Sequence, residues 1–203
     1  MRYSNTHKKQ TEQNITNAAL DEFRSNGYHG VGIDGIAKSA GVTSGAFYTH
    51  FGSKSDAFLR AIEVGLKQVS NELDRRRTED TGEWLSEFLD WYLTPPDAAD
   101  AMSKATLQAF PIQGGCALTS LAPEVCRSGT QAKHVFEKEL MTTIALIKDG
   151  LDEGGNKEAW SILSSLIGAI TLARSVKNND TAVEILSSVL STTLDLLKET
   201  EPA

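Results

Sequence analysis

The regular spacing of apolar residues limits this chain to one kind of fold. Apolar side chains recur every three or four positions through most of the 203 residues, which is the periodicity of a helix face and not the alternation of a strand. Only five prolines interrupt the pattern, and no hairpin dipeptide separates two β-branched runs. We therefore predict an all-α protein.

The amino-terminal part is predicted to hold two short helices joined by a tight turn. The first helix of the chain has an apolar face that includes Ile15 and Phe23, and it ends within SNGYHG, where Gly27 is expected at the C-cap. A short helix in IDGIAKSAG follows, Gly41 and Val42 form the turn, and a second short helix runs through TSGAFYTHF. Two short helices joined by a turn that contains glycine are the helix-turn-helix pattern.

The second short helix suits the major groove of DNA because its leading end is small. The groove is only about 12 Å wide, and TSGA supplies short side chains. Thr43 is expected to cap this helix, Phe47 to turn back onto the bracing helix, and Phe51 to join the core. The side chains left on the outer side can bond to phosphate oxygens or base edges; they are Tyr48, Thr49 and His50.

The rest of the chain is predicted to form further helices. A long helix begins near Ser53–Asp56, with Ser53 as its cap, and continues to about Arg77. Later helices are expected within residues 83–93, 116–125, 129–152, 157–177 and 180–198, and residues 97–110 can also be helical. The last two helices are apolar nearly all round, so a second subunit is expected to cover them.

The segment ALDEFRSNGYHGVGIDGIAKSAGVTSGAFYTHFGSKSDAFLRAI resembles the DNA-binding domain of the TetR (tetracycline-repressor-like) family of bacterial regulators. The resemblance covers roughly residues 10–62. It depends on Phe23-x-x-x-Gly27-Tyr28, the Ile36-Ala37 pair, the Ala40-Gly41-Val42 turn, and Phe47-Tyr48-x-His50-Phe51 followed by Ser53-Lys54.

This resemblance implies a role for each matching position. Three positions correspond to the family's base-reading residues, namely Ser44, Gly45 and Tyr48. Four correspond to its clamps on the DNA backbone, namely Thr43, Thr49, His50 and Lys54. Lys8 and Lys9 are either an arm that reaches phosphates or solvated surface charge. Gly32 departs from the pattern, because many members have Ser or Thr before the bracing helix.

The resemblance also implies a division of the chain into two parts. We expect an N-terminal three-helix helix-turn-helix DNA-binding domain in residues 1–53, and a larger C-terminal helical effector-binding and dimerisation domain in residues 54–203. The candidate ligand-pocket wall is apolar and aromatic, and consists of Trp84, Phe88, Trp91, Tyr92, Phe110, Leu118, Phe136 and Leu140. The candidate dimer interface consists of Leu163, Ile167, Gly168, Ile170, Val189, Leu190 and Leu197.

The charge of the chain is unevenly distributed. Residues 1–60 contain seven Lys and Arg against five Asp and Glu, whereas residues 61–203 contain thirteen against twenty-two, for a net charge of −7 overall. An acidic remainder would be repelled by DNA and held away from it. The first fourteen residues lack the apolar core of a secretory signal, and the longest apolar run, LIGAITLA, is too short to span a bilayer. We expect a cytoplasmic protein without a membrane partner.

The function predicted from these features is a ligand-responsive transcriptional repressor that binds a pseudo-palindromic operator as a homodimer. A small, largely apolar effector is expected to release it. No catalytic residues, metal ligands or cofactor are expected, because the four histidines lack ligand spacing and no phosphate-binding glycine loop is present. A non-catalytic helical carrier of small molecules is an alternative.

A second alternative is a repressor that senses electrophiles or oxidants through cysteine. GGCALTSLAPEV resembles a segment in one branch of the family, some of whose members work in this way. Cys116 and Cys126 are ten residues apart, so on one helix they lie roughly 15 Å apart, too far for a disulfide within one subunit. Two buried, inert thiols are the simpler interpretation.

Overall fold

The computed structural model describes residues 5–79, 82–94, 116–151 and 155–198. Nine helices and no strands make up these ranges, so the predicted all-α class is confirmed. The helices are α1 (Asn5–Gly30), α2 (Ile33–Ser39), α3 (Ser44–His50), α4 (Lys54–Glu79), α5 (Trp84–Leu93), α7 (Ala117–Cys126), α8 (Thr130–Asp149), α9 (Asn156–Ser175) and α10 (Asn179–Lys198). The segment predicted as helical at residues 97–110, including Phe110, lies outside the described ranges.

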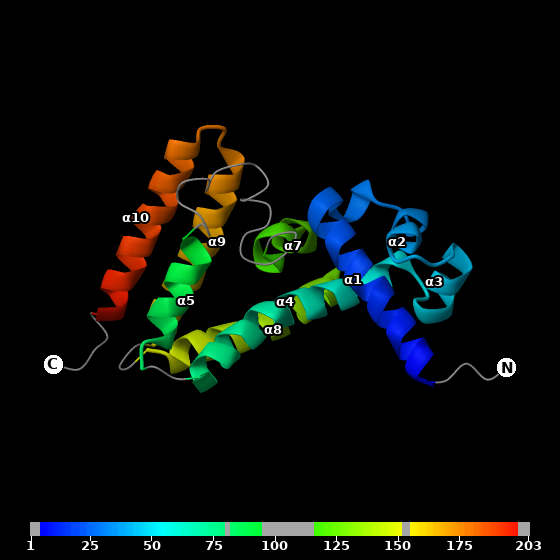
Figure 1. Ribbon diagram of the computed structural model, residues 1–203, viewed down its shortest axis with the longest axis horizontal. Helices are drawn as coiled ribbons and strands as arrows, with labels where there is room; N and C mark the ends of the chain where they lie inside the picture. The colour runs from blue at the N-terminus through cyan, green and yellow to red at the C-terminus, as the bar shows by residue number, and fades with distance from the viewer. Residues whose placement is uncertain (1–4, 80–81, 95–115, 152–154, 199–203) are drawn as a thin grey trace.

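The helices form two groups joined by a long helix. The first three lie together at one end, α5, α9 and α10 gather at the other, and α4 extends between the two ends with α8 beside it (Figure 1). Helix α7 packs against α1, α4 and α9 near the middle of the molecule. None of the helices in the described ranges combines the length and the hydropathy needed to cross a bilayer.

Helix α4 has the apolar stripe that the sequence predicts. Its five apolar positions Phe58, Ile62, Leu66, Val69 and Leu73 are each at most 2% exposed. Their spacing of three and four residues places them on one side of the helix, which therefore packs against α1 and α8. As predicted, Ser53 caps the helix, because its Oγ accepts a hydrogen bond from the Asp56 amide at 3.1 Å.

Gly65 lies where α4, α7 and α1 approach one another closely. A Cβ added there would lie 2.7 Å from the Cβ of Ala117 on α7 and 2.8 Å from Cδ1 of Leu20 on α1. No other residue type leaves room for this crossing, so Gly65 allows α7 to wedge between the first helix and the long helix.

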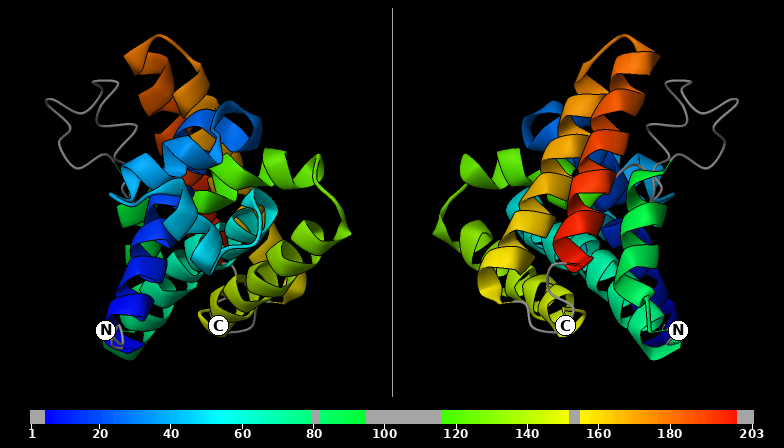
Figure 2. Two further views of the ribbon diagram at one scale, coloured as in Figure 1. Left: turned by 90° about the vertical axis from the view of Figure 1, so that its right-hand side faces the viewer. Right: turned by 90° about the vertical axis from the view of Figure 1, so that its left-hand side faces the viewer.

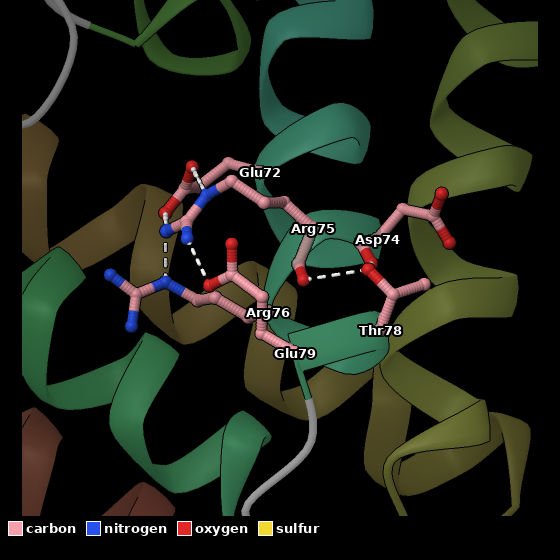
Figure 3. A network of polar contacts seen from close by, with 6 residues as sticks. All are labelled: Glu72, Asp74, Arg75, Arg76, Thr78 and Glu79. Atoms are coloured by element: carbon pink, nitrogen blue, oxygen red, sulfur yellow. Dashed lines mark hydrogen bonds and ion pairs between the residues drawn. The ribbon is translucent and has the colours of Figure 1, made fainter.

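The last turns of α4 carry a dense network of charged side chains (Figure 3). Glu72 accepts hydrogen bonds from both Arg75 and Arg76, and Arg75 also pairs with Glu79. Two contacts extend from this region to other helices. The Arg76 guanidinium lies 4.8 Å from the centroid of Trp91 on α5, and Arg77 Nη1 lies 3.0 Å from Asp149 Oδ2 on α8. These contacts fasten the carboxyl end of α4 to both neighbouring helices.

Candidate nucleic-acid interface

The turn between α2 and α3 is fixed by glycine geometry and backbone hydrogen bonds. Gly41 has a φ of 68°, in the left-handed region that other residues rarely adopt. The Gly41 amide donates to the Lys38 carbonyl at 3.1 Å, and the Val42 amide donates to the Ala37 carbonyl at 2.9 Å. These hydrogen bonds end α2 in a short turn, and α3 follows directly after it.

The first turn of α3 is capped as the sequence predicts. Thr43 has an extended backbone, and its Oγ1 accepts a hydrogen bond from the Ala46 amide at 3.1 Å. By contrast, Gly32 precedes α2 without any side-chain cap. Gly45 is exposed, and a Cβ added there would meet only Thr43 Oγ1, at 3.8 Å. The leading end of α3 is therefore free of bulky side chains.

The two aromatic residues of α3 differ in burial, as predicted. Phe47 is completely buried and contacts Phe51, with 5.6 Å between the ring centroids. Tyr48 is 56% exposed, which is unusual for a large aromatic side chain. The outward face of α3 therefore consists of an exposed tyrosine behind a turn of small residues.

The hydroxyls of this surface are partly engaged within the protein. Thr49 Oγ1 donates to the Gly45 carbonyl at 3.0 Å, so it offers only lone pairs to an incoming group unless that bond breaks. Thr43 Oγ1 accepts its hydrogen bond and keeps its own hydrogen available for a phosphate oxygen. Ser44 Oγ donates to Asp34 Oδ1 at 2.5 Å, a contact that the sequence did not reveal.

His50 lies at the edge of a cleft between α3 and the beginning of α1. The cleft has a volume of about 510 Å³ and is lined by His7, Lys8, Thr11, Val42, Thr43, Ala46, Thr49 and His50. Within the described ranges, the Nδ1 atom of His50 is buried and has no hydrogen-bond partner. Residues from the first helix thus share a surface with the outer residues of α3, a grouping that depends on tertiary packing.

Lys54 is held over an aromatic ring. Its Nζ lies 4.5 Å from the centroid of Tyr28, and that ring in turn packs against Phe58 at 4.8 Å. Its charge is therefore fixed between the end of α1 and the start of α4.

Comparison with known proteins supports the same interpretation. The sequence model described as "Bacterial regulatory proteins, tetR family" matches residues 15–61. The HTH-type transcriptional regulator LmrA of Bacillus subtilis (strain 168) is 26% identical over 197 residues, 93% of this chain and 97% of its own length.

The fold comparison extends the match over the whole chain. A TetR-family transcriptional regulator from Cytophaga hutchinsonii has a TM-score of 0.75 with 20% identity, covering 100% of both chains. The reduced form of E. coli NemR has a TM-score of 0.74 with 17% identity, covering 92% of this chain and 97% of its own. Residues 15–61 therefore match the DNA-binding domain of the TetR family, and the chain has the fold of TetR-family regulators. It is therefore a helix-turn-helix transcriptional regulator.

The residues predicted to line a ligand pocket lie in or beside the core of the C-terminal helices. Trp84, Phe88, Tyr92 and Leu118 are buried, each at most 8% exposed. Trp91, Phe136 and Leu140 are partly buried against the hydrophobic core. The role of these residues as the wall of a ligand pocket stays a prediction.

The residues predicted for the dimer interface divide into two groups. Leu163 and Ile170 are at most 3% exposed within one subunit, so their side chains cannot also form a contact surface for a partner. Ile167, Gly168, Val189, Leu190 and Leu197 are only partly covered. The apolar side chains most exposed on these helices are Leu172, Val183 and Trp160, at 57%, 43% and 37%. Periodicity identified apolar helices correctly but did not determine which face the subunit itself covers.

The two cysteines occupy opposite ends of α7 and have different environments. Cys116 immediately precedes the helix and is completely buried, whereas Cys126 is its last residue and is exposed. The expectation of two buried thiols is therefore wrong for Cys126. Burial raises the pKa of the neighbouring Tyr92 well above its usual value, and the Cys116 side chain adds to the rise through its charge and a hydrogen bond.

Arg24 is a buried arginine of α1 whose charge lies near this cysteine. Its side chain is 1% exposed, and its Nη2 donates to Gln68 Oε1 on α4 at 2.6 Å. Burial lowers the pKa of the Arg24 guanidinium, and the nearby Cys116 and Asp21 partly offset this effect. No sequence pattern pointed to Arg24, because an arginine on an amphipathic helix is normally a surface residue.

Proposed function

We propose that this chain is a repressor that binds a pseudo-palindromic DNA operator as a homodimer and leaves it when a small, largely apolar molecule binds. The observation that carries the DNA-binding part is the outward face of α3. It combines a bare leading end at Gly45 with Tyr48 at 56% exposure, directly after the glycine turn. A helix of this form fits a groove about 12 Å wide without displacing bulky side chains.

The proposed contacts divide into two kinds. Ser44, Gly45 and Tyr48 would face the base edges, and Thr43, Thr49, His50 and Lys54 would hold the backbone. Thr43 supports this assignment because its hydroxyl hydrogen is not used within the helix. His50 supports it through its unpartnered Nδ1 beside the cleft that also includes Lys8. Lys54 would contribute a charge at a position fixed by Tyr28.

A salt-titrated gel shift tests this proposal directly. Double-stranded DNA from upstream of the chain's own coding region is the first probe, and a scrambled duplex of the same length is the control. The expected result is specific binding whose affinity falls steeply with salt, because each phosphate contact releases condensed counterions. Equal and weak affinity for both duplexes would instead favour the carrier function.

We further propose that the dimer forms through the outer faces of α9 and α10, which lie side by side in the right-hand view of Figure 2. Three large apolar side chains, Trp160, Leu172 and Val183, are exposed there in the single subunit. Gly168 lies on the same helix as Trp160 and Leu172, and a Cβ added to it would meet nothing within 4 Å. An exposed apolar surface with small residues allows close packing of two helix pairs. Sedimentation at micromolar concentration is expected to give a dimer, and a monomer would contradict this part.

The proposed effector response depends on α4. This helix begins beside the DNA-binding helices and ends in contacts with α5 and α8, through Arg76 to Trp91 and Arg77 to Asp149. A ligand that shifts the packing of Trp91 would alter the tilt of α4 and therefore the separation of the two α3 helices. Such a ligand releases DNA if it binds more tightly to the dimer conformation in which the separation of the two α3 helices does not fit the operator. A thermal-shift screen with apolar and aromatic metabolites identifies such ligands.

The cysteine-sensing alternative depends on Cys116, because a modification at its position would disturb the packing of several helices. Cys116 is completely buried beside the start of α7, where Tyr92 of α5 is its hydrogen-bonding partner and the charge of Arg24 of α1 lies nearby. A quinone that adds to this thiol forms a carbon–sulfur bond and takes the thiol proton, and its bulk would force α7 away from α1. Under this alternative Cys116→Ser abolishes the effect of quinone on DNA binding and Cys126→Ser preserves it. An unchanged response in Cys116→Ser would exclude it.

A further inference from the structure

Asp34 and Ser44 link the beginnings of the two helices in the helix-turn-helix. Asp34 lies in the first turn of α2, and Ser44 is the first residue of α3. Ser44 Oγ donates a hydrogen bond to Asp34 Oδ1 at 2.5 Å. Asp34 is exposed, and within the described ranges no basic side chain forms an ion pair with it. The result is an oriented carboxylate at the solvent surface.

This carboxylate belongs to the surface that we propose enters the major groove. Ser44 and Tyr48 are four residues apart on α3, so they lie on the same side of the helix. Tyr48 is 56% exposed on that side. Asp34, bonded to Ser44, is therefore next to the residues proposed to face the base edges.

The pair offers acceptors and no donors to a ligand. An ionised carboxylate has only lone pairs, and the single hydroxyl hydrogen of Ser44 is already given to Asp34. A DNA phosphate has the same character and would be repelled. In the major groove, the exocyclic amino groups of cytosine and adenine are donors, whereas guanine N7 and O6 and thymine O4 are acceptors. Only the amino groups complement this pair.

We propose that Asp34, oriented by Ser44, is a specificity-determining residue that requires cytosine or adenine on one strand at one position of each operator half-site. The inference rests on the proposed function, since it needs α3 to lie in the major groove. It also changes the role of Ser44, whose hydroxyl aligns the carboxylate and does not itself donate to a base.

Selection of binding sites from a pool of randomised duplexes tests the inference with the full-length chain. Wild type is expected to enrich sites with cytosine or adenine at one position per half-site. Four duplexes that differ only at that position are then compared, and guanine or thymine is expected to lower affinity by roughly tenfold or more. Asp34→Asn can rotate its amide to present a donor, so its discrimination is expected to fall below about threefold.

Glu22→Gln is the matched control. Glu22 also accepts a hydrogen bond from a serine, Ser39, at 2.5 Å, but it links α1 to α2 and not α2 to α3. This variant removes the same charge and should keep the wild-type preference. Thermal melting confirms that each variant folds, and Ser44→Ala replaces Asp34→Asn if the latter does not, with discrimination again expected to fall.

The outcomes separate this inference from the function on which it rests. A wild-type chain that enriches no sequence would remove the proposed function and the inference with it. A wild-type chain that enriches a clear site, whose preference at every position is unchanged in Asp34→Asn, would overturn the inference alone.

Discussion

Phe47 and Tyr48 meet edge to face, with ring centroids 5.8 Å apart and planes at 88°, yet Phe47 is completely buried and Tyr48 is 56% exposed. Adjacent residues on one helix thus serve different purposes. The inner ring attaches α3 to the domain, and the outer ring is presented to solvent. Substitutions at these two positions should therefore have separable effects.

Phe47→Ala is expected to destabilise the fold. Removing a fully buried phenylalanine side chain eliminates its burial and leaves a cavity, which costs about 3–5 kcal/mol. Urea unfolding followed by circular dichroism measures this loss. Tyr48→Ala serves as the control and should stay within roughly 0.5 kcal/mol of wild type, because the side chain is exposed. Similar losses in both variants would mean that Tyr48 is also part of the core.

Tyr48→Phe is expected to weaken operator binding without affecting stability. The change removes only a hydroxyl, and a lost hydrogen bond to a charged or base-edge group costs about 1.5 kcal/mol, or roughly tenfold in affinity. Fluorescence anisotropy with a labelled operator duplex gives the dissociation constant. If Tyr48→Phe bound as tightly as wild type, the hydroxyl would have no part in DNA recognition.

Gly168→Ala is expected to weaken the dimer while leaving each subunit intact. Within the subunit a Cβ at this position meets nothing within 4 Å, and alanine favours a helix over glycine by up to about 1 kcal/mol. If a partner helix packs closely there, the added methyl group instead separates the two subunits. Sedimentation equilibrium should show a raised dimer dissociation constant. Thr142→Ala, at an exposed position of α8 outside the proposed interface, is the control. An unchanged dimer would place the interface elsewhere.

Glu72→Gln is expected to make the free energy of unfolding depend less on pH in the acid range. Hydrogen bonding by Arg75 and then Arg76 lowers the pKa of the Glu72 carboxyl below its ordinary value of 4.5. A lowered folded-state pKa means that Glu72 stabilises the protein above pH 4.5, and that this contribution disappears as pH falls through the folded-state pKa. The difference between variant and wild type, measured by urea unfolding from pH 3 to 7, should therefore be present at neutral pH and vanish under acid. Because the pair is partly solvated, we expect under about 1 kcal/mol. A difference independent of pH would argue against the ion pairs as its source.

The sequence predicted the features that depend on local rules. Gly41 in the turn, Thr43 as a cap and Phe47 on the inner face follow from backbone conformation, capping chemistry and helical periodicity. It did not predict that Asp34 binds Ser44 or that Lys54 lies over Tyr28. Both contacts join residues from different helices, and their geometry is determined only when α1, α2 and α3 pack together.

The same limit applies to the C-terminal helices. Leu163 and Trp160 are three residues apart and appear equivalent in the apolar pattern, but Leu163 is 3% exposed and Trp160 is 37% exposed. The spacing of apolar residues indicates only that a helix is apolar on two sides. Which side faces the subunit depends on how α9 crosses α10 and α5, which the sequence pattern does not specify.

The central claim is that two copies of α3 enter successive major grooves on one face of the DNA, at a separation fixed by the dimer. The most direct test is to insert five base pairs between the half-sites of the selected operator and measure affinity by gel shift. Half a helical turn moves the second half-site to the opposite face, so the account predicts a loss of at least about a hundredfold. Inserting ten base pairs restores the face but adds a full turn of about 34 Å to the separation, so a dimer of fixed span is expected to show no recovery. Equal affinity for all three spacings would contradict it.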